Sequence, residues 1–180
     1  TVDPAKVDSE DEKLEDDTAC DAASFLASLS SVENKLHARR LMSDGVPSAL
    51  CEFLSRKHCT SVKVLSVNGL MNFFSWKEIA SKFVDTVIEP VLDLLRETGC
   101  VEAANCIFNL MRFDNCELKL ITLNVHVTLL DVMCAMNAKM SDAKSACLRA
   151  LCRFSGNEQC IFAWLDADLI DLSRHQYALA

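Results

Sequence analysis

The stretch Cys100–Asp114, CVEAANCIFNLMRFD, recurs in related form about forty residues to either side. If Leu110 of this stretch is taken as an anchor, the matching residues are Leu29, Leu70 and Leu151, which gives steps of 41, 40 and 41 residues. Three nearly equal steps indicate an internal repeat. The period of a repeat indicates the fold class, so we consider it before any short motif.

Apolar residues recur at fixed distances from this anchor. Three residues before it stand Leu26, Val67, Ile107 and Leu148. Three residues after it stand Val32, Phe73, Phe113 and Phe154. Together with the positions four and seven before the anchor, which include Cys106 and Ala103, these residues give a stripe at i, i+3, i+4 and i+7, as on the apolar face of an amphipathic helix. We expect this face to point into the core.

Two further amphipathic segments precede the anchor helix in each repeat. The nearer one is GVPSALCEFL at 45–54, TVIEPVLDLL at 86–95 and NVHVTLLDVM at 124–133. A shorter one stands before each of these: VENKLHARRLM, KEIASKFV, CELKLITL and, at the end, NEQCIFAWL. The whole chain has only four Gly and three Pro, too few for the turns of an all-β protein. We therefore predict an all-α chain whose repeat contains three helices of unequal length.

This organisation resembles the armadillo repeat, a unit of about forty residues with one short and two longer helices. The resemblance implies an armadillo-like right-handed superhelix, an α-solenoid, over residues 18–180, with full units at about 32–75, 76–114 and 115–155 and partial units at 18–31 and 156–180. Gly45 matches a glycine typical of the family, whereas Val87 and Val125 depart from it. The related HEAT repeat remains an alternative.

The resemblance also implies a binding surface, because the third helices of armadillo-like proteins line a concave groove. Helical periodicity places the positions five, two and one before the anchor and two after it away from the apolar stripe. Besides Leu65, Gly69, Ala146 and Ala150, these positions give a predicted partner-binding surface of Asn68, Asn72, Asn105, Phe108, Asn109, Arg112, Arg149 and Arg153.

The composition of this surface indicates what it would bind. Peptide-binding armadillo proteins carry a ladder of Asn residues, of which Asn109 is the one rung here, with Ser28, Gly69 and Ala150 at the equivalent places. Recognition of basic import signals is therefore not expected. Guanidinium groups suit carboxylate or phosphate oxygens, so we expect a ligand with acidic groups and an apolar residue that meets Phe108. The alternative is a solvated face without a ligand.

The net charge of −8 is unevenly distributed. Residues 1–17, TVDPAKVDSEDEKLEDD, hold eight acidic and two basic residues, which leaves only −2 for the rest. A segment so charged and poor in apolar residues is predicted to be a disordered tail. A further hypothesis is that this tail folds over the arginines and competes with a ligand, more strongly with phosphate on Ser9. No basic footprint for nucleic acid is present.

The ten cysteines include no C-x-x-C pair. Cys106, Cys147 and Cys152 stand among apolar residues at helical spacing, so we expect reduced, structural cysteines in a cytoplasmic or nuclear protein. His58 next to Cys59 is the one tight His–Cys pair, and zinc there would need two further ligands. Phosphate-binding, hydrolase and metalloprotease motifs are absent, so neither an enzyme nor a cofactor is expected.

Together these features predict a non-catalytic protein-interaction scaffold that binds a peptide or partner surface. Two alternatives stay open: a self-association module forming a homo-oligomer, and a regulator of a partner's nucleotide cycle. The sequence has no apolar run long enough for a membrane span and no secretory signal. It begins without Met and stops inside a predicted helix, so we expect a segment of a longer protein.

Overall fold

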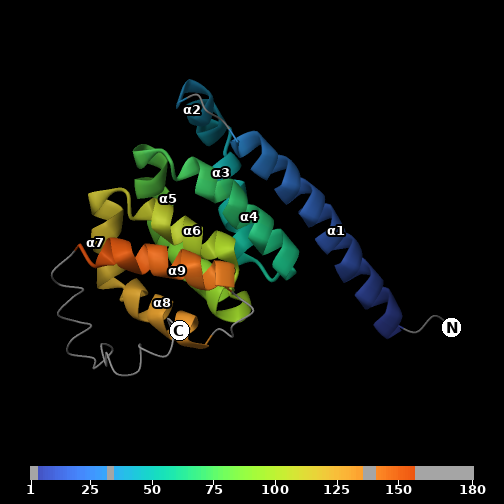
Figure 1. Ribbon diagram of the computed structural model, residues 1–180. Helices are drawn as coiled ribbons and strands as arrows, with labels where there is room; N and C mark the ends of the chain where they lie inside the picture. Colours follow the sequence, from blue (N-terminus) through green and yellow to red (C-terminus); the bar gives the residue numbers. More distant parts are fainter. Residues whose placement is uncertain (1–3, 32–34, 136–140, 157–180) are drawn as a thin grey trace.

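The computed structural model describes residues 4–31, 35–135 and 141–156, and within these ranges the chain is helical and has no strands (Figure 1). The helices are α1 (Pro4–Ser30), α2 (Lys35–Ser43), α3 (Val46–Ser55), α4 (Thr60–Phe73), α5 (Lys77–Thr98), α6 (Val101–Leu110), α7 (Asp114–Thr122), α8 (Val125–Ala135) and α9 (Ser141–Phe154). The predicted all-α class is confirmed for this part of the chain. The last predicted unit, 156–180, lies outside the described residues except for Gly156.

The helices pack in two rows. In the first row α1 contacts α4, α4 contacts α6, and α6 contacts α9. In the second row α3 contacts α5 and α5 contacts α8, and each of these helices packs on the member of the first row that follows it in the chain. Figure 1 shows α1 and α9 at opposite ends of the first row, with α4 and α6 between them. The helices that carry the anchor leucines are therefore neighbours.

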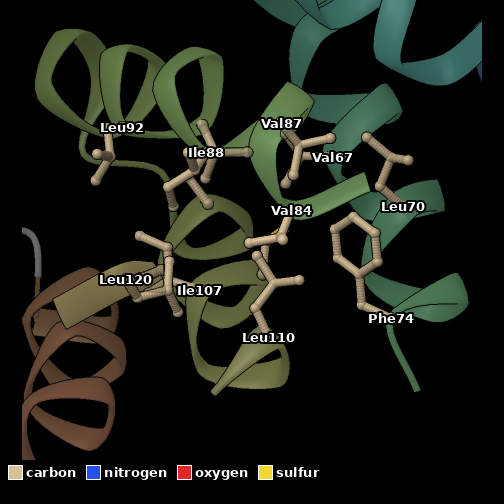
Figure 2. Close-up of a cluster of buried hydrophobic side chains, with 14 of the residues drawn as sticks. Val67, Leu70, Phe74, Val84, Val87, Ile88, Leu92, Ile107, Leu110 and Leu120 are labelled. Atoms are coloured by element: carbon tan, nitrogen blue, oxygen red, sulfur yellow. The ribbon is translucent and has the colours of Figure 1, made fainter. Parts of the chain in front are cut away.

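The core lies between the two rows. Leu70 and Leu110, the anchors of α4 and α6, are fully buried. They pack in one cluster with the apolar faces of α5 and α7, including Val84, Ile88 and Leu120 (Figure 2). Each such side chain contributes roughly 1.5–3 kcal/mol through its removal from water. The predicted stripe is thus a core stripe in these two helices.

The first helix differs from its prediction. Residues 4–17, predicted to be a disordered tail, continue without a break into α1. Asp16, inside the predicted tail, accepts hydrogen bonds from the backbone N–H of Cys59 at 3.3 Å and lies 3.2 Å from His58 Nδ1. Pro4 in the first turn and the Glu and Lys residues of the segment favour a helix, which the net charge of the segment does not reveal.

The buried face of α1 is also displaced from the predicted stripe. Ala19, Ala23 and Ala27 are buried, whereas Leu29 is only half-buried and Phe25 is exposed. Small side chains allow two helix backbones to approach closely, so α1 packs on α4 through alanines. The stripe that holds for α4 and α6 therefore does not hold for α1.

The predicted break between the first two helices of a unit depends on one residue. Gly45, before α3, has φ 82°, and Asn124, before α8, has φ 54°; both Gly and Asn tolerate this left-handed conformation. In the middle unit the segments 45–54 and 86–95 align Gly45 with Thr86, one residue before the Val87 compared with it above, and the β-branched side chain of Thr86 disfavours this conformation. The segments 77–84 and 86–95, predicted to be separate, therefore form the single helix α5. Pro90 inside α5 lacks the N–H that would bond the Thr86 carbonyl.

In α9, the last described helix, a residue of the predicted stripe is exposed and residues outside the stripe are buried. Leu148, predicted to be buried, is 48% exposed. Ala146 and Ala150, predicted to point outward, are fully buried, and so is Gly69 of α4. The positions one and five before the anchor therefore face a neighbouring helix in these cases, because α9 packs on α6 as well as on α8, and α4 packs on α1 as well as on α3.

The cysteines divide into two groups. Cys106 and Cys147 are fully buried, and burial raises the pKa of the Cys147 thiol to about 11, so that it stays protonated at neutral pH. These two residues pack as small apolar side chains, as predicted. Cys152 was predicted to join them but is exposed. All described cysteines are free thiols.

Among the described residues no single helix is long and apolar enough to cross a bilayer. The pair α7 and α8, bent by 68°, reaches the required length and composition only when its two helices are taken together.

A buried histidine predicts a pH dependence of stability. His126 of α8 lies against the ring of Phe154 on α9, with 5.7 Å between ring centroids, and burial lowers its pKa. The unfolded chain therefore binds this proton more tightly, and acidification below the ordinary His pKa favours unfolding. We expect the free energy of unfolding to fall between about pH 7.5 and pH 5.5 because of this residue. Urea titrations at several pH values measure the fall.

Two variants assign that fall to His126. His126→Gln is expected to have a smaller decrease on acidification, whereas His37→Gln, at an exposed position of α2, keeps the decrease of the original chain. An unchanged decrease in His126→Gln would show that other groups cause it.

Candidate interaction surface

The residues of the predicted partner-binding surface lie on three adjacent helices. Asn68 and Asn72 belong to α4; Asn105, Phe108 and Asn109 to α6; Arg112 follows the end of α6; Arg149 and Arg153 belong to α9. Since α6 contacts both α4 and α9, the packing brings these residues onto neighbouring elements. Asn68 and the three arginines are exposed, and the other four residues are half-buried.

Polar side chains of this surface connect neighbouring helices to one another. Asn72 Nδ2 donates to Ser30 Oγ of α1 at 3.0 Å, and Asn109 Nδ2 donates to the Met71 carbonyl of α4 at 3.3 Å. Arg149 donates from a terminal nitrogen to Asn105 Oδ1 at 3.0 Å. Each pair of adjacent helices in the first row is thus joined by one such bond.

These bonds change the expected role of the asparagines. One of the two side-chain N–H groups of Asn109, the one rung of the asparagine ladder, is already donated within the chain. Ser30 and the Met71 carbonyl, which accept the bonds from Asn72 and Asn109, were not predicted as part of this surface. Each acceptor stands about one repeat before the asparagine that bonds to it, and this spacing is the sequence feature that could have indicated the two acceptors.

The arginines of this surface differ from the others in the described chain. Arg39, Arg40, Arg56 and Arg96 each form an ion pair with a carboxylate, namely Glu78, Asp44, Glu52 and Asp93. Arg112, Arg149 and Arg153 form no ion pair with any described residue. The unpaired arginines are therefore those that α6 and α9 bring together.

The carboxylates of the same two helices lie at the opposite end. Glu102 is in the first turn of α6 and Asp142 is in the first turn of α9, whereas Arg153 is in the last turn of α9. A cation at a helix C-terminus is favoured by about 0.3–1 kcal/mol through the helix dipole. The dipole accounts for the position of Arg153 but not for Arg149, which lies a full turn earlier. The cations Arg149 and Arg153 thus lie in the C-terminal half of α9, while Arg112 follows α6 and stands two residues before Asp114 in the first turn of α7.

One aromatic side chain lies beside these arginines. Phe108 is half-buried and packs against the main core cluster, so its position is fixed by α6 while part of the ring stays accessible. A half-buried aromatic ring offers apolar area at little cost in side-chain entropy. The strongly exposed apolar residues of the described chain are Phe25, Leu36, Leu118, Leu123 and Leu148, and of these Leu148 is the one on a helix of this surface, α9.

The predicted surface is not a deep pocket. One open pocket of ≈ 430 Å³ lies between the end of α5 and α8, lined by residues that include Arg96, Thr98 and Asp131. Another of ≈ 450 Å³ lies between α1 and the end of α3, lined by residues that include Phe53 and His58. Neither contains a residue of the predicted surface.

In the part of the chain that the structure describes, no group of three or more His, Cys, Asp or Glu side chains is placed to hold a metal ion. The His58–Cys59 pair, considered above as half of a zinc site, has Asp16 as its neighbour on α1.

The hypothesis that the acidic segment covers the arginines does not agree with the packing. Residues 4–30 form α1, which packs on α4, and α6 and α9 lie beyond α4 (Figure 1). A continuous helix cannot turn back within the segment, so the acidic residues of α1 stay at the other end of the row from Arg149 and Arg153.

No protein-family model, curated protein or solved structure matches this chain.

Proposed function

We propose that this chain is a non-catalytic protein-interaction module with the armadillo-like solenoid arrangement, and that it binds an acidic segment of a partner protein along α4, α6 and α9. The repeat period of about forty residues and the side-by-side packing of the anchor helices support the solenoid. The observation that carries the binding function is the set of three arginines, Arg112, Arg149 and Arg153, which have no carboxylate partner among the described residues.

The chemistry of the surface favours an acidic ligand with an apolar residue. A guanidinium group binds a carboxylate through two parallel hydrogen bonds, and such charge-assisted bonds are stronger than neutral ones. The asparagines hold the helices in register through their bonds to Ser30 and Met71, so the ligand is bound by the arginines rather than by an amide ladder. Phe108 contacts an apolar side chain between the acidic groups and excludes water around it.

A charge-reversed variant tests the proposal. We expect Arg112→Glu/Arg153→Glu to bind fluorescein-labelled peptides, in which Glu residues flank one Phe or Leu, at least tenfold more weakly than the original chain does. Tenfold corresponds to about 1.4 kcal/mol, which is modest for two lost charge-assisted bonds and two new repulsions. Fluorescence anisotropy at low and high salt measures the Kd, and high salt is expected to weaken binding by the original chain.

The matched control changes the net charge equally at another place. Arg40→Glu/Lys57→Glu reverses two exposed cations on α2 and in the loop before α4, and it should bind the same peptides within about twofold of the original affinity. Circular dichroism verifies that all variants are equally helical. Equal losses of affinity in both variants would mean that binding depends on the net charge of the protein and not on the position of these arginines. Failure of the original chain to bind any acidic peptide of the set would remove the support for an acidic partner.

A further inference from the structure

The contact between α1 and the loop before α4 contains a cluster of polar and sulfur-bearing side chains that the proposed function does not use. Asp16 of α1 lies 3.2 Å from His58 Nδ1 and accepts the backbone N–H of Cys59 at 3.3 Å. The His58 side chain is only 7% exposed and packs edge-on against Phe53. These contacts fix the position of Cys59 relative to α1.

A second cysteine lies one helical turn further along α1. Cys20 follows Asp16 by four residues and so shares its face of the helix, about 6 Å along the axis. Helical side chains lean toward the N-terminus, which directs Cys20 back toward Asp16. Cys20 also packs against the cluster that contains Val62 in the first turn of α4, the helix that Cys59 caps. Both thiols therefore lie at the same junction.

We propose that Cys20 and Cys59 are a redox-sensitive pair that forms a reversible disulfide between α1 and the start of α4 when the protein meets a peroxide. Both cysteines are free thiols in the structure. Cys59 is exposed and is the residue that the oxidant reaches, while Cys20 is half-buried beside it. Disulfides of this transient kind are the ones that occur in reducing compartments.

The chemistry proceeds in two steps and balances. The Cys59 thiolate attacks one oxygen of hydrogen peroxide, the O–O bond breaks, and the departing hydroxide takes up the proton that Cys59 released, which gives water and a sulfenic acid. The Cys20 sulfur then attacks the Cys59 sulfur, the S–S bond forms as the S–O bond breaks, and a second water leaves with the Cys20 proton. The two thiols lose two electrons and the peroxide gains them.

The surroundings of Cys20 bear on which of the two cysteines is oxidised first. Partial burial raises the pKa of the Cys20 thiol, and the negative charges of a Cys59 thiolate and of three carboxylates of α1 raise it further. Cys20 is thus held as a thiol that reacts with peroxide slowly, because the thiolate is the nucleophile. Its attack on the Cys59 sulfenic acid also requires the thiolate, and there the proximity of the two residues in the fold favours the reaction. A small dithiol or glutathione reverses the bond by thiol–disulfide exchange.

The bond would add a covalent link between two helices that already pack closely. Among the described side chains, α1 packs on α4 through small residues, and Asp16 accepts the backbone N–H of Cys59 before the start of α4. A disulfide between residues 20 and 59 removes conformational freedom from the unfolded chain. We expect oxidation to raise the Tm by about 5–10 °C, a range typical of one native-like disulfide in a chain of this size.

Peptide mass spectrometry of the 180-residue chain tests the proposal. The chain is treated with hydrogen peroxide, free thiols are alkylated, and trypsin releases residues 14–35 and 58–63, each with a single cysteine. We expect a cross-linked pair of these two peptides to be at least tenfold more abundant than any other disulfide, and dithiothreitol to abolish it. Cys152→Ser, which removes another exposed cysteine, should give the same cross-link and the same rise in Tm.

Single variants of the pair separate its two roles. In Cys20→Ser we expect no cross-link, no rise in Tm, and a sulfenic acid at Cys59 that a dimedone-type reagent traps. Cys59→Ser should lose both the cross-link and the trapped sulfenic acid. The proposal is overturned if peroxide joins Cys59 mainly to other cysteines or to a second molecule, or if Cys20→Ser keeps the rise in Tm.

Discussion

Replacing Leu110 by Ala is expected to lower the free energy of unfolding by about 3–4 kcal/mol. Leu110 is the anchor of α6 and is 0% exposed. In Figure 2 it lies beside Val84 of α5, within the cluster that joins α4, α5 and α6. Removal of the isobutyl group loses its transfer free energy and leaves a cavity, because helices packed on several sides relax only partly.

Urea denaturation followed by circular dichroism measures this loss. The matched control is Leu118→Ala, the same substitution on α7 at a side chain that is 60% exposed. It should change the free energy of unfolding by less than about 0.5 kcal/mol. A loss for Leu110→Ala no larger than that of the control would mean that α6 is not packed as the structure has it.

Replacing Gly69 by Val is the second change for which a large effect is expected. A methyl group at Gly69 would lie 2.8 Å from Leu50 Cδ1 and 3.1 Å from the Cα of Ala27. The Leu50 side chain is fully buried and the Ala27 atom belongs to the backbone of α1, so neither can move freely. We expect a loss of about 2–3 kcal/mol from overpacking, even though Val forms helices better than Gly does.

The helix in which the packing is weakened distinguishes the effect of this substitution from a uniform loss of stability. Since Gly69 faces α1, amide hydrogen exchange should increase first in α1 and much less in α6 and α9. Gly156→Val is the control, because a methyl group there meets only the Arg153 carbonyl, at 3.5 Å, an ordinary contact. Uniform exchange across all helices in Gly69→Val would contradict the close packing of α1 on α4.

The candidate surface shows which structural features a repeat pattern predicts and which it does not. The equal spacing of the anchors predicted which positions share a face, and α4, α6 and α9 do lie side by side. It did not predict that Asn109 bonds the Met71 carbonyl or that Arg149 bonds Asn105. Those bonds depend on how far one helix is shifted along the next, which no single repeat encodes.

The sequence by itself determined the helical class and the core stripe of α4 and α6, because apolar residues at helical spacing must be buried wherever the helix packs. Two predictions were wrong for local reasons: helix propensity outweighs net charge in the acidic segment of α1, and Thr86 disfavours the left-handed turn that would divide α5. Only the tertiary structure decided the burial of alanines of α9 in place of Leu148. That burial depends on the helix that lies next to α9, and a periodic stripe carries no information about this neighbour.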